Sequence, residues 1–295
     1  MSITELVERN VRLYGQDPAP FTLSHPRGIR LVTNGQRHGP ITRLASPTDV
    51  GELIKPFVFL DLAELPAKSE PLFGFHPHSG IATVTTILRG AVTYEDTTGK
   101  SGVLRAGDVE WMKAGNGVWH DGSPVPGEPM RGFQLWIALP QWVENSHAES
   151  EYVGWQDVEH DGPARVILGR YGRAKSAVRG ARIDVNYLHV HLRDGERWTY
   201  TPPEGHDVAW LAIDTGALEA AETIHAGELA VFDESEHAID LVARGDTSFV
   251  LGSAPRHPHE LVLGSHSVHT SYAALAEGRL EINRIGGQLH AAGRI

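Results

Sequence analysis

Three histidines in the first half of the chain have residue types and a spacing that suit a metal site. His76 and His78 stand two positions apart, and His120 follows after two runs rich in β-branched residues. Residues two apart on an extended backbone point to the same face, so the first two imidazoles aim together. A third histidine on a neighbouring strand completes a set of nitrogen ligands for a divalent ion. We therefore predict that the three rings converge; the alternative is hydrogen-bonded residues at the mouth of a pocket.

Two further histidine pairs are weaker candidates for the same chemistry. They are His189 and His191, with His206 or His237 as a third partner, and His257 with His259. The first pair also has same-face spacing, but neither of its possible partners follows at a clear strand spacing. The second pair is bounded by prolines, which is typical of a surface loop.

Short strands with glycine-rich turns are the elements that would position these histidines. Buried-strand patterns recur along the chain, as in residues 133–139 (FQLWIAL), and are typical of an antiparallel sandwich or barrel. Helical periodicity is scarce except in the tail. There Ser271 is the expected N-cap of a helix that carries Leu275 and Leu280, and a second helical turn is expected over residues 282–289.

A weak internal repeat connects the two halves of the chain. Residues 104–111 (LRAGDVEW) realign with residues 224–231 (IHAGELAV), and residues 85–92 (TTILRGAV) with residues 211–218 (LAIDTGAL). A strand, a glycine turn, a second strand and an Ala-Gly-acidic turn therefore occur twice. This pattern predicts two tandem β-barrels of one design.

The repeat also suggests where one domain ends and the next begins. Residues 140–151 are polar and lack strand character, as expected of a linker. We therefore predict an N-terminal domain over residues 1–145, which contains the candidate metal site. A C-terminal domain over residues 146–295 is expected to lack a metal and to end in the helical tail.

The composition excludes several classes of function. A formal net charge of −11 argues against general affinity for nucleic acids or anionic lipids, which require a basic surface. The absence of cysteine excludes disulfides, thiolate metal sites and cysteine nucleophiles. No signal-peptide pattern opens the sequence, and its apolar stretches are too short to cross a bilayer. We expect a cytoplasmic protein without direct contact with nucleic acid or membrane.

A resemblance to a known family is found in six stretches: residues 74–80 (GFHPHSG), 83–90 (TVTTILRG), 107–120 (GDVEWMKAGNGVWH), 132–140 (GFQLWIALP), 227–232 (GELAVF) and 267–275 (SVHTSYAAL). With these motifs the chain resembles the pirins, which are two-domain cupins, over most of its length. The resemblance implies an all-β bicupin with two tandem antiparallel β-barrels, each a double-stranded β-helix, and a short C-terminal helical segment. It also implies one divalent metal in the N-terminal barrel, usually iron, with nickel, zinc, copper and manganese as alternatives.

The family's metal ligands map only in part onto this sequence. The three family histidines correspond to His76, His78 and His120. Gly122 stands where the family has a glutamate ligand, and Ala82 stands where it has a second glutamate. Asp121 could replace the ligand only where the strand bulges, because alternation turns its side chain away from that of His120. The resemblance thus implies a three-histidine site whose metal is either weakly bound or absent.

Two kinds of function follow from the resemblance. Some pirins are similar to quercetin dioxygenases, in which a metal holds substrate oxygens and dioxygen side by side. The substrate would then be a flavonol- or catechol-like small molecule. The alternatives are a non-enzymatic pirin-like regulator recognised by a protein partner, and a metal-free cupin that binds a small molecule. Because the family's glutamate is absent, the sequence identifies no catalytic acid or base.

Overall fold

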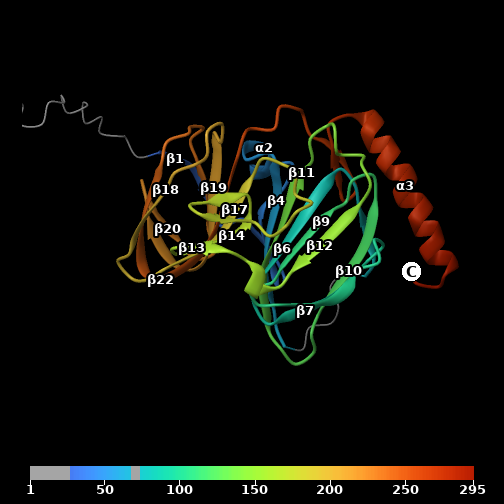
Figure 1. Cartoon of the computed structure of the whole chain (residues 1–295), viewed down its shortest axis with the longest axis horizontal. Helices are drawn as coiled ribbons and strands as arrows, with labels where there is room; N and C mark the ends of the chain where they lie inside the picture. Colours follow the sequence, from blue (N-terminus) through green and yellow to red (C-terminus); the bar gives the residue numbers. More distant parts are fainter. Residues whose placement is uncertain (1–26, 68–73) are drawn as a thin grey trace, which may run out of the picture.

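The computed structural model describes residues 27–67 and 74–295, and antiparallel strands dominate it (Figure 1). Strands from the first half of the chain form a seven-stranded sheet in the order β12-β9-β6-β11-β4-β3-β2. Its strands are β2 (Gln36–His38), β3 (Ile41–Ala45), β4 (Phe57–Leu65), β6 (Ile81–Arg89), β9 (Val109–Lys113), β11 (Met130–Ala138) and β12 (Glu149–Val153). A four-stranded sheet in the order β5-β10-β7-β8 packs against it. Its strands are β5 (His76–His78), β7 (Ala91–Asp96), β8 (Ser101–Arg105) and β10 (Val118–Pro124).

The second half is built around a nine-stranded sheet. The main path is β1-β21-β19-β22-β17-β14-β13, with β18 paired to β22 and β20 paired to β19. Its strands are β1 (Ile29–Thr33), β13 (His160–Asp161), β14 (Ala164–Leu168), β17 (Asn186–Leu192), β18 (Arg197–Tyr200), β19 (Val208–Glu219), β20 (Thr223–His225), β21 (Leu229–Phe232) and β22 (Ile239–Ala254). Two small hairpins complete the strands: β15 (Arg170–Tyr171) with β16 (Ala174–Lys175), and β23 (Val262–Gly264) with β24 (Ser267–His269). The all-β prediction is confirmed.

The repeat seen in the sequence is also a repeat of turn geometry. Gly107 and Gly227 occupy the same position in the two Ala-Gly-acidic turns, with φ angles of 88° and 83°. A residue without a Cβ adopts this backbone region at low cost. The acidic residue that follows, Asp108 or Glu228, accepts a hydrogen bond from the backbone N–H three residues before it, at 2.8 and 2.7 Å. Both halves therefore use the same turn for the same reason.

The largest core cluster lies where the seven-stranded and nine-stranded sheets pack together. Trp111 and Phe133 contribute from the first sheet, and Tyr187 and Trp210 contribute from the second. The rings of Phe57 and Trp210 meet edge-on with centroids 5.4 Å apart. Burying one large apolar side chain stabilises the fold by about 1.5–3 kcal/mol, so this contact holds the two halves together.

The two halves exchange strands across the predicted linker. β12 follows the linker but pairs with β9 in the sheet of the first half. β1 precedes the whole first half but pairs with β21 in the sheet of the second. The predicted boundary between residues 145 and 146 remains a prediction, because each sheet takes a strand from the other side of it.

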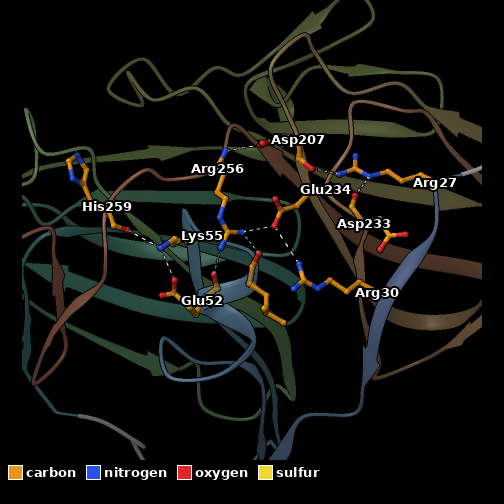
Figure 2. Close-up of polar contacts among 10 residues, drawn as sticks. Arg27, Arg30, Glu52, Lys55, Asp207, Asp233, Glu234, Arg256 and His259 are labelled. Atoms are coloured by element: carbon orange, nitrogen blue, oxygen red, sulfur yellow. Dashed lines mark hydrogen bonds and ion pairs between the residues drawn. The ribbon is translucent and has the colours of Figure 1, made fainter.

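Polar contacts join the two halves next to this core (Figure 2). The Nη1 atom of Arg256 donates to the Glu234 carboxylate at 2.9 Å and to the carbonyl of Leu53 at 3.2 Å. Leu53 ends the short helix α2 (Val50–Leu53). The buried Lys55 ammonium donates to the carbonyl of His259 at 3.0 Å. These contacts fix the segment before β4 against the second half.

The chain ends in helix α3 (Tyr272–Ala291), which packs beside β10 of the first half (Figure 1). As predicted, Ser271 is the N-cap: its hydroxyl accepts a 3.1 Å hydrogen bond from the N–H of Ala274. The tail is one continuous helix, so the expected second turn is not separate. Leu275 is buried, but Leu280 is 72% exposed, since it lies off the helix face that packs. No helix among the described residues is long and apolar enough to cross a membrane.

Substitution of Gly80 can test how closely the C-terminal segment packs against the first half. Its φ is 73°, and a Cβ there would lie 2.0 Å from the carbonyl oxygen of Val268. We expect Gly80→Ala to lower the free energy of unfolding by clearly more than the roughly 1–2 kcal/mol of a positive φ alone. Gly39→Ala is the matched control, with a φ of 60° and no atom within 4 Å of the new Cβ. Equal losses for the two variants in urea unfolding would contradict this account.

Candidate metal centre

Strands β5 and β10 bring the three predicted histidines together. Their antiparallel register sets His76 opposite His120, and His78 opposite Val118. Because His76 and His78 are two apart on β5, all three rings lie on one side of the sheet. One ring nitrogen from each lies within 4.8 Å of the other two, and the Nε2 atoms of His78 and His120 are 3.1 Å apart.

Backbone carbonyls orient two of the three rings. The Nδ1 atom of His76 donates to the carbonyl of Gly74 at 2.9 Å, and the Nδ1 atom of His78 donates to the carbonyl of His266 at 2.8 Å. A carbonyl only accepts, so the proton of each neutral ring is on Nδ1 and the lone pair is on Nε2. Hydrogen bonds of this kind fix the tautomer of a metal-binding histidine.

The electrostatics of the cluster keep the rings neutral. Burial lowers the pKa of all three histidines, and for His78 it does so to about 3, helped by the charge of neighbouring His76. Neutral imidazole is the form that binds a metal. Three such nitrogens fit a divalent ion such as iron, nickel, zinc or copper.

A buried polar cluster holds β5 in place from behind. Ser79, next to His78, has its Oγ 2.9 Å from His269 Nε2 and donates to the Ser267 hydroxyl at 3.0 Å. The other ring nitrogen of His269 lies 3.3 Å from the Glu144 carboxylate. These four residues are at most 2% exposed, so the cluster is closed off from solvent. The cluster therefore ties β5, which carries two of the candidate ligands, to the returning C-terminal segment.

No carboxylate of the described residues joins the three histidines. Gly122 is on the same side of β10 as His120, and a Cβ there would meet only the carbonyl oxygen of Thr93, at 3.7 Å. Asp121 turns the other way, since β10 keeps its register with both neighbours and has no bulge. Space for a fourth ligand is thus present at Gly122, but the side chain is missing.

The inward face of the seven-stranded sheet carries a row of polar residues, one on each of six neighbouring strands. In register across the sheet these are Tyr152, Glu110, Thr85, Gln134, Asp61 and Arg43. Arg43 donates two 2.9 Å hydrogen bonds to Asp61. Apolar clusters that bridge the two sheets lie on both sides of the row, one containing Met112 and Val118, the other Ile87 and Val92. The interior of the N-terminal half is therefore polar at its middle.

Glu110 is the titratable centre of this row. Burial, with the nearby Asp96 charge, raises its pKa to about 7. The Thr85 hydroxyl contacts both the Glu110 carboxyl and the side-chain oxygen of Gln134. One arrangement that satisfies both contacts has a protonated Glu110 donating to Thr85 and Thr85 donating onward to Gln134. The sequence analysis did not single out Glu110. Strand alternation in residues 109–113 (VEWMK) was the available signal, but the residues that contact Glu110 come from strands distant in the sequence.

Aromatic residues connect the histidines with this polar row. The ring of Trp136 lies 4.9 Å from the ring of His78, edge to face, and stacks on Phe59 at 4.1 Å. The Arg43 guanidinium lies over the other ring of that pair, 4.2 Å from the centroid of Phe59. A flat apolar surface thus adjoins the candidate metal centre.

The second half has no comparable interior. The inward positions of β18 and β22 hold Trp198, Tyr200, Ile239 and Leu241, which belong to one continuous apolar cluster. His189 and His191 alternate with the inward-facing Leu188 and Val190, so that pair points away from the interior. The Nε2 atom of His189 instead contacts the hydroxyl of Ser248 at 3.0 Å.

The remaining candidate histidines are accounted for by other contacts. His206 is buried between the Ser253 hydroxyl and Asp184, at 2.8 and 3.0 Å, and His237 is exposed. His257 was expected in a surface loop but is only 6% exposed, because its segment packs into the junction of the two halves. Within the described ranges, the three histidines at residues 76, 78 and 120 form the one group with metal-site spacing.

Two tandem β-domains, with a histidine cluster in the first and an apolar interior in the second, define a two-domain cupin. A family model described as Pirin matches residues 40–137. A Pseudomonas aeruginosa protein, provisionally named quercetin 2,3-dioxygenase PA2418, is 30% identical over 246 residues, which cover 76% of this chain and 85% of that protein. A pirin-like protein of Caulobacter vibrioides is 33% identical over 63% of this chain and 70% of its own length. The chain belongs to the pirin family, as its motifs predict.

Solved structures agree with this assignment. The crystal structure of a quercetin 2,3-dioxygenase from Acinetobacter baumannii has a TM-score of 0.79 and 26% identity, over 88% of this chain and 98% of that one. The Escherichia coli pirin YhhW, solved in complex with nickel(II), has a TM-score of 0.61 and 19% identity, over 78% and 98% of the two chains. The second likeness concerns the fold alone.

The open space at Gly122 gives a direct test of the metal centre. We expect Gly122→Glu to tighten nickel binding at least about 10-fold, because it adds an anionic ligand on the side of His120. Asp121→Glu is the matched control: it keeps the charge beside His76, places a glutamate on the opposite face of β10, and should leave the affinity unchanged. A competition titration of nickel against a chelator measures both. An unchanged affinity in Gly122→Glu would show either that the side chain at residue 122 does not reach the ion or that a fourth ligand is already present.

The raised pKa of Glu110 predicts a specific dependence of stability on pH. Its pKa of about 7 in the fold lies above its ordinary value of 4.5, so the folded state binds more protons between these values. Stability then falls as pH rises from about 4.5 to about 7, by up to roughly 3 kcal/mol, and levels off above. Glu110→Gln keeps the shape of the side chain but cannot titrate. We expect the free energy of unfolding of this variant, measured in urea, to lack the decrease that Glu110 causes in the wild type. Parallel pH profiles for variant and wild type would contradict the assignment.

Proposed function

We propose that this pirin is a metal-dependent dioxygenase that acts on a flavonol- or catechol-like substrate. The observation that carries the proposal is the contrast between its two halves. The first combines three neutral imidazoles with an inward polar row, whereas the second has a continuous apolar cluster whose few buried polar side chains bond to one another. A stable fold alone does not require a buried Glu110 or three clustered imidazoles on the inward face, since burying polar groups costs free energy.

The ligands we propose for the cofactor are His76, His78 and His120. Iron is the metal suggested by the family motifs, and the nickel complex of YhhW makes nickel the main alternative. When bound, the ion supplies a positive charge that draws the adjacent oxygens of a chelating substrate and dioxygen to one place.

The protein's own residues would orient the substrate and handle its proton. The absence of a side chain at Gly122 leaves room for substrate oxygens beside the histidines. The partly exposed Trp136 ring, supported from behind by Phe59, offers a surface on which an aromatic ring can stack. The Glu110 carboxyl, with its pKa of about 7, can accept or release a proton on the inward face near neutral pH. The net charge of −11 fits a small-molecule partner and not nucleic acid.

Turnover of quercetin under oxygen, followed by absorbance and by oxygen uptake, tests the proposal. We expect metal-loaded protein to consume quercetin and oxygen. His78→Ala should lower kcat/KM by about 100-fold or more, because a metal ligand is lost. His191→Ala is the matched control, because that exposed histidine lies on β17 outside the site. If fully metal-loaded protein turns over neither flavonols nor catechols, the proposed dioxygenase activity is wrong and the function of a pirin-like regulator is favoured.

A further inference from the structure

His266 is the one non-glycine residue with positive φ in the described part of the chain, at 60°. It lies with Ser265 in the two-residue connection between β23 and β24. Glycine is favoured at such a position, and histidine is, with asparagine and aspartate, among the side chains that adopt it more often than others.

The residue is tied to the candidate metal centre through its backbone. Its carbonyl accepts the 2.8 Å hydrogen bond from Nδ1 of His78. The neighbouring Ser267 forms a parallel bridge with Ser79 and bonds to its hydroxyl at 3.0 Å. The connection between β23 and β24 is therefore fixed relative to β5, although the two are far apart in the sequence.

The ring of His266 lies at the edge of the histidine cluster. Its centroid is 6.0 Å from that of His76 and 6.0 Å from that of His78. The three central rings are 4.4–5.0 Å apart, the spacing expected when metal–nitrogen bonds are about 2.0–2.1 Å. His266 is thus 1.0 Å farther from His78 than His120 is, at 6.0 against 5.0 Å. Because His266 is exposed, rotation of its side chain can close this difference without disturbing the core.

We propose that His266 supplies a fourth imidazole ligand to the metal. This inference rests on the proposed three-histidine metal site and adds to it. No described carboxylate joins the cluster and Gly122 has no side chain to offer, so a fourth protein donor would have to come from another segment. Four neutral imidazoles would leave the positive charge of the ion uncompensated. A set of three histidines and one carboxylate would neutralise one unit of that charge. The returning C-terminal segment would then contribute directly to the metal site of the first half.

X-ray absorption of the nickel-loaded protein, which counts imidazole ligands, tests the proposal together with a chelator-competition affinity. We expect four imidazoles in the wild type and three in His266→Asn, with nickel affinity lower by about 10- to 100-fold or more. Asparagine tolerates the positive φ and keeps the carbonyl that orients His78, so only the ring is lost. His237→Asn is the matched control, since it removes an exposed histidine outside the site.

Two further variants separate the possible outcomes. Gly122→Glu in the His266→Asn background should restore affinity with three imidazoles and one carboxylate. Wild-type protein with three imidazoles, and the same affinity in His266→Asn, would overturn the fourth ligand. If His78→Ala then abolishes nickel binding, the three-histidine site stands without His266. Wild-type protein that binds no nickel or iron would overturn both proposals.

Discussion

The register between β5 and β10 is the constraint on which the candidate site depends. It sets His76 opposite His120, and a shift of one residue would turn one set of rings to the other face. β5 is only three residues long, so its own ladder holds it weakly. The additional restraint comes from the C-terminal segment, where Ser267 and His269 contact Ser79 directly behind the metal-site strand. The end of the chain thus stabilises a site formed mainly near its beginning.

The two halves share a strand arrangement but differ in the side chains that they place inside. Both use the same glycine turn, and both place alternate side chains inside. In the first half the inward positions carry the histidines and the polar row around Glu110, which costs desolvation free energy. In the second they carry Trp198, Tyr200 and other apolar residues, which stabilise the fold and offer no ligand. The apolar half and the shared core at Trp210 can offset the cost of the polar one.

Local patterns in the sequence predict those structural features that are determined by residues close together in the chain. The spacing of His76 and His78, the Ser271 cap and the repeated turns were all readable, because strand alternation and capping act over a few positions. The polar row was not readable, since each member comes from a different strand and only the pairing of the sheet aligns them. The same holds for the ring of His266, which reaches the cluster through a hairpin nearly two hundred residues away in sequence, as does its hydrogen bond to His78.

Anomalous diffraction at the iron and nickel edges, from crystals of protein purified without chelators, would test the central claim most directly. The account predicts one peak per chain, at about 2.0–2.2 Å from the Nε2 atoms of His76, His78 and His120. A peak beside His189 and His191 in the second half, or no peak at either edge, would contradict it.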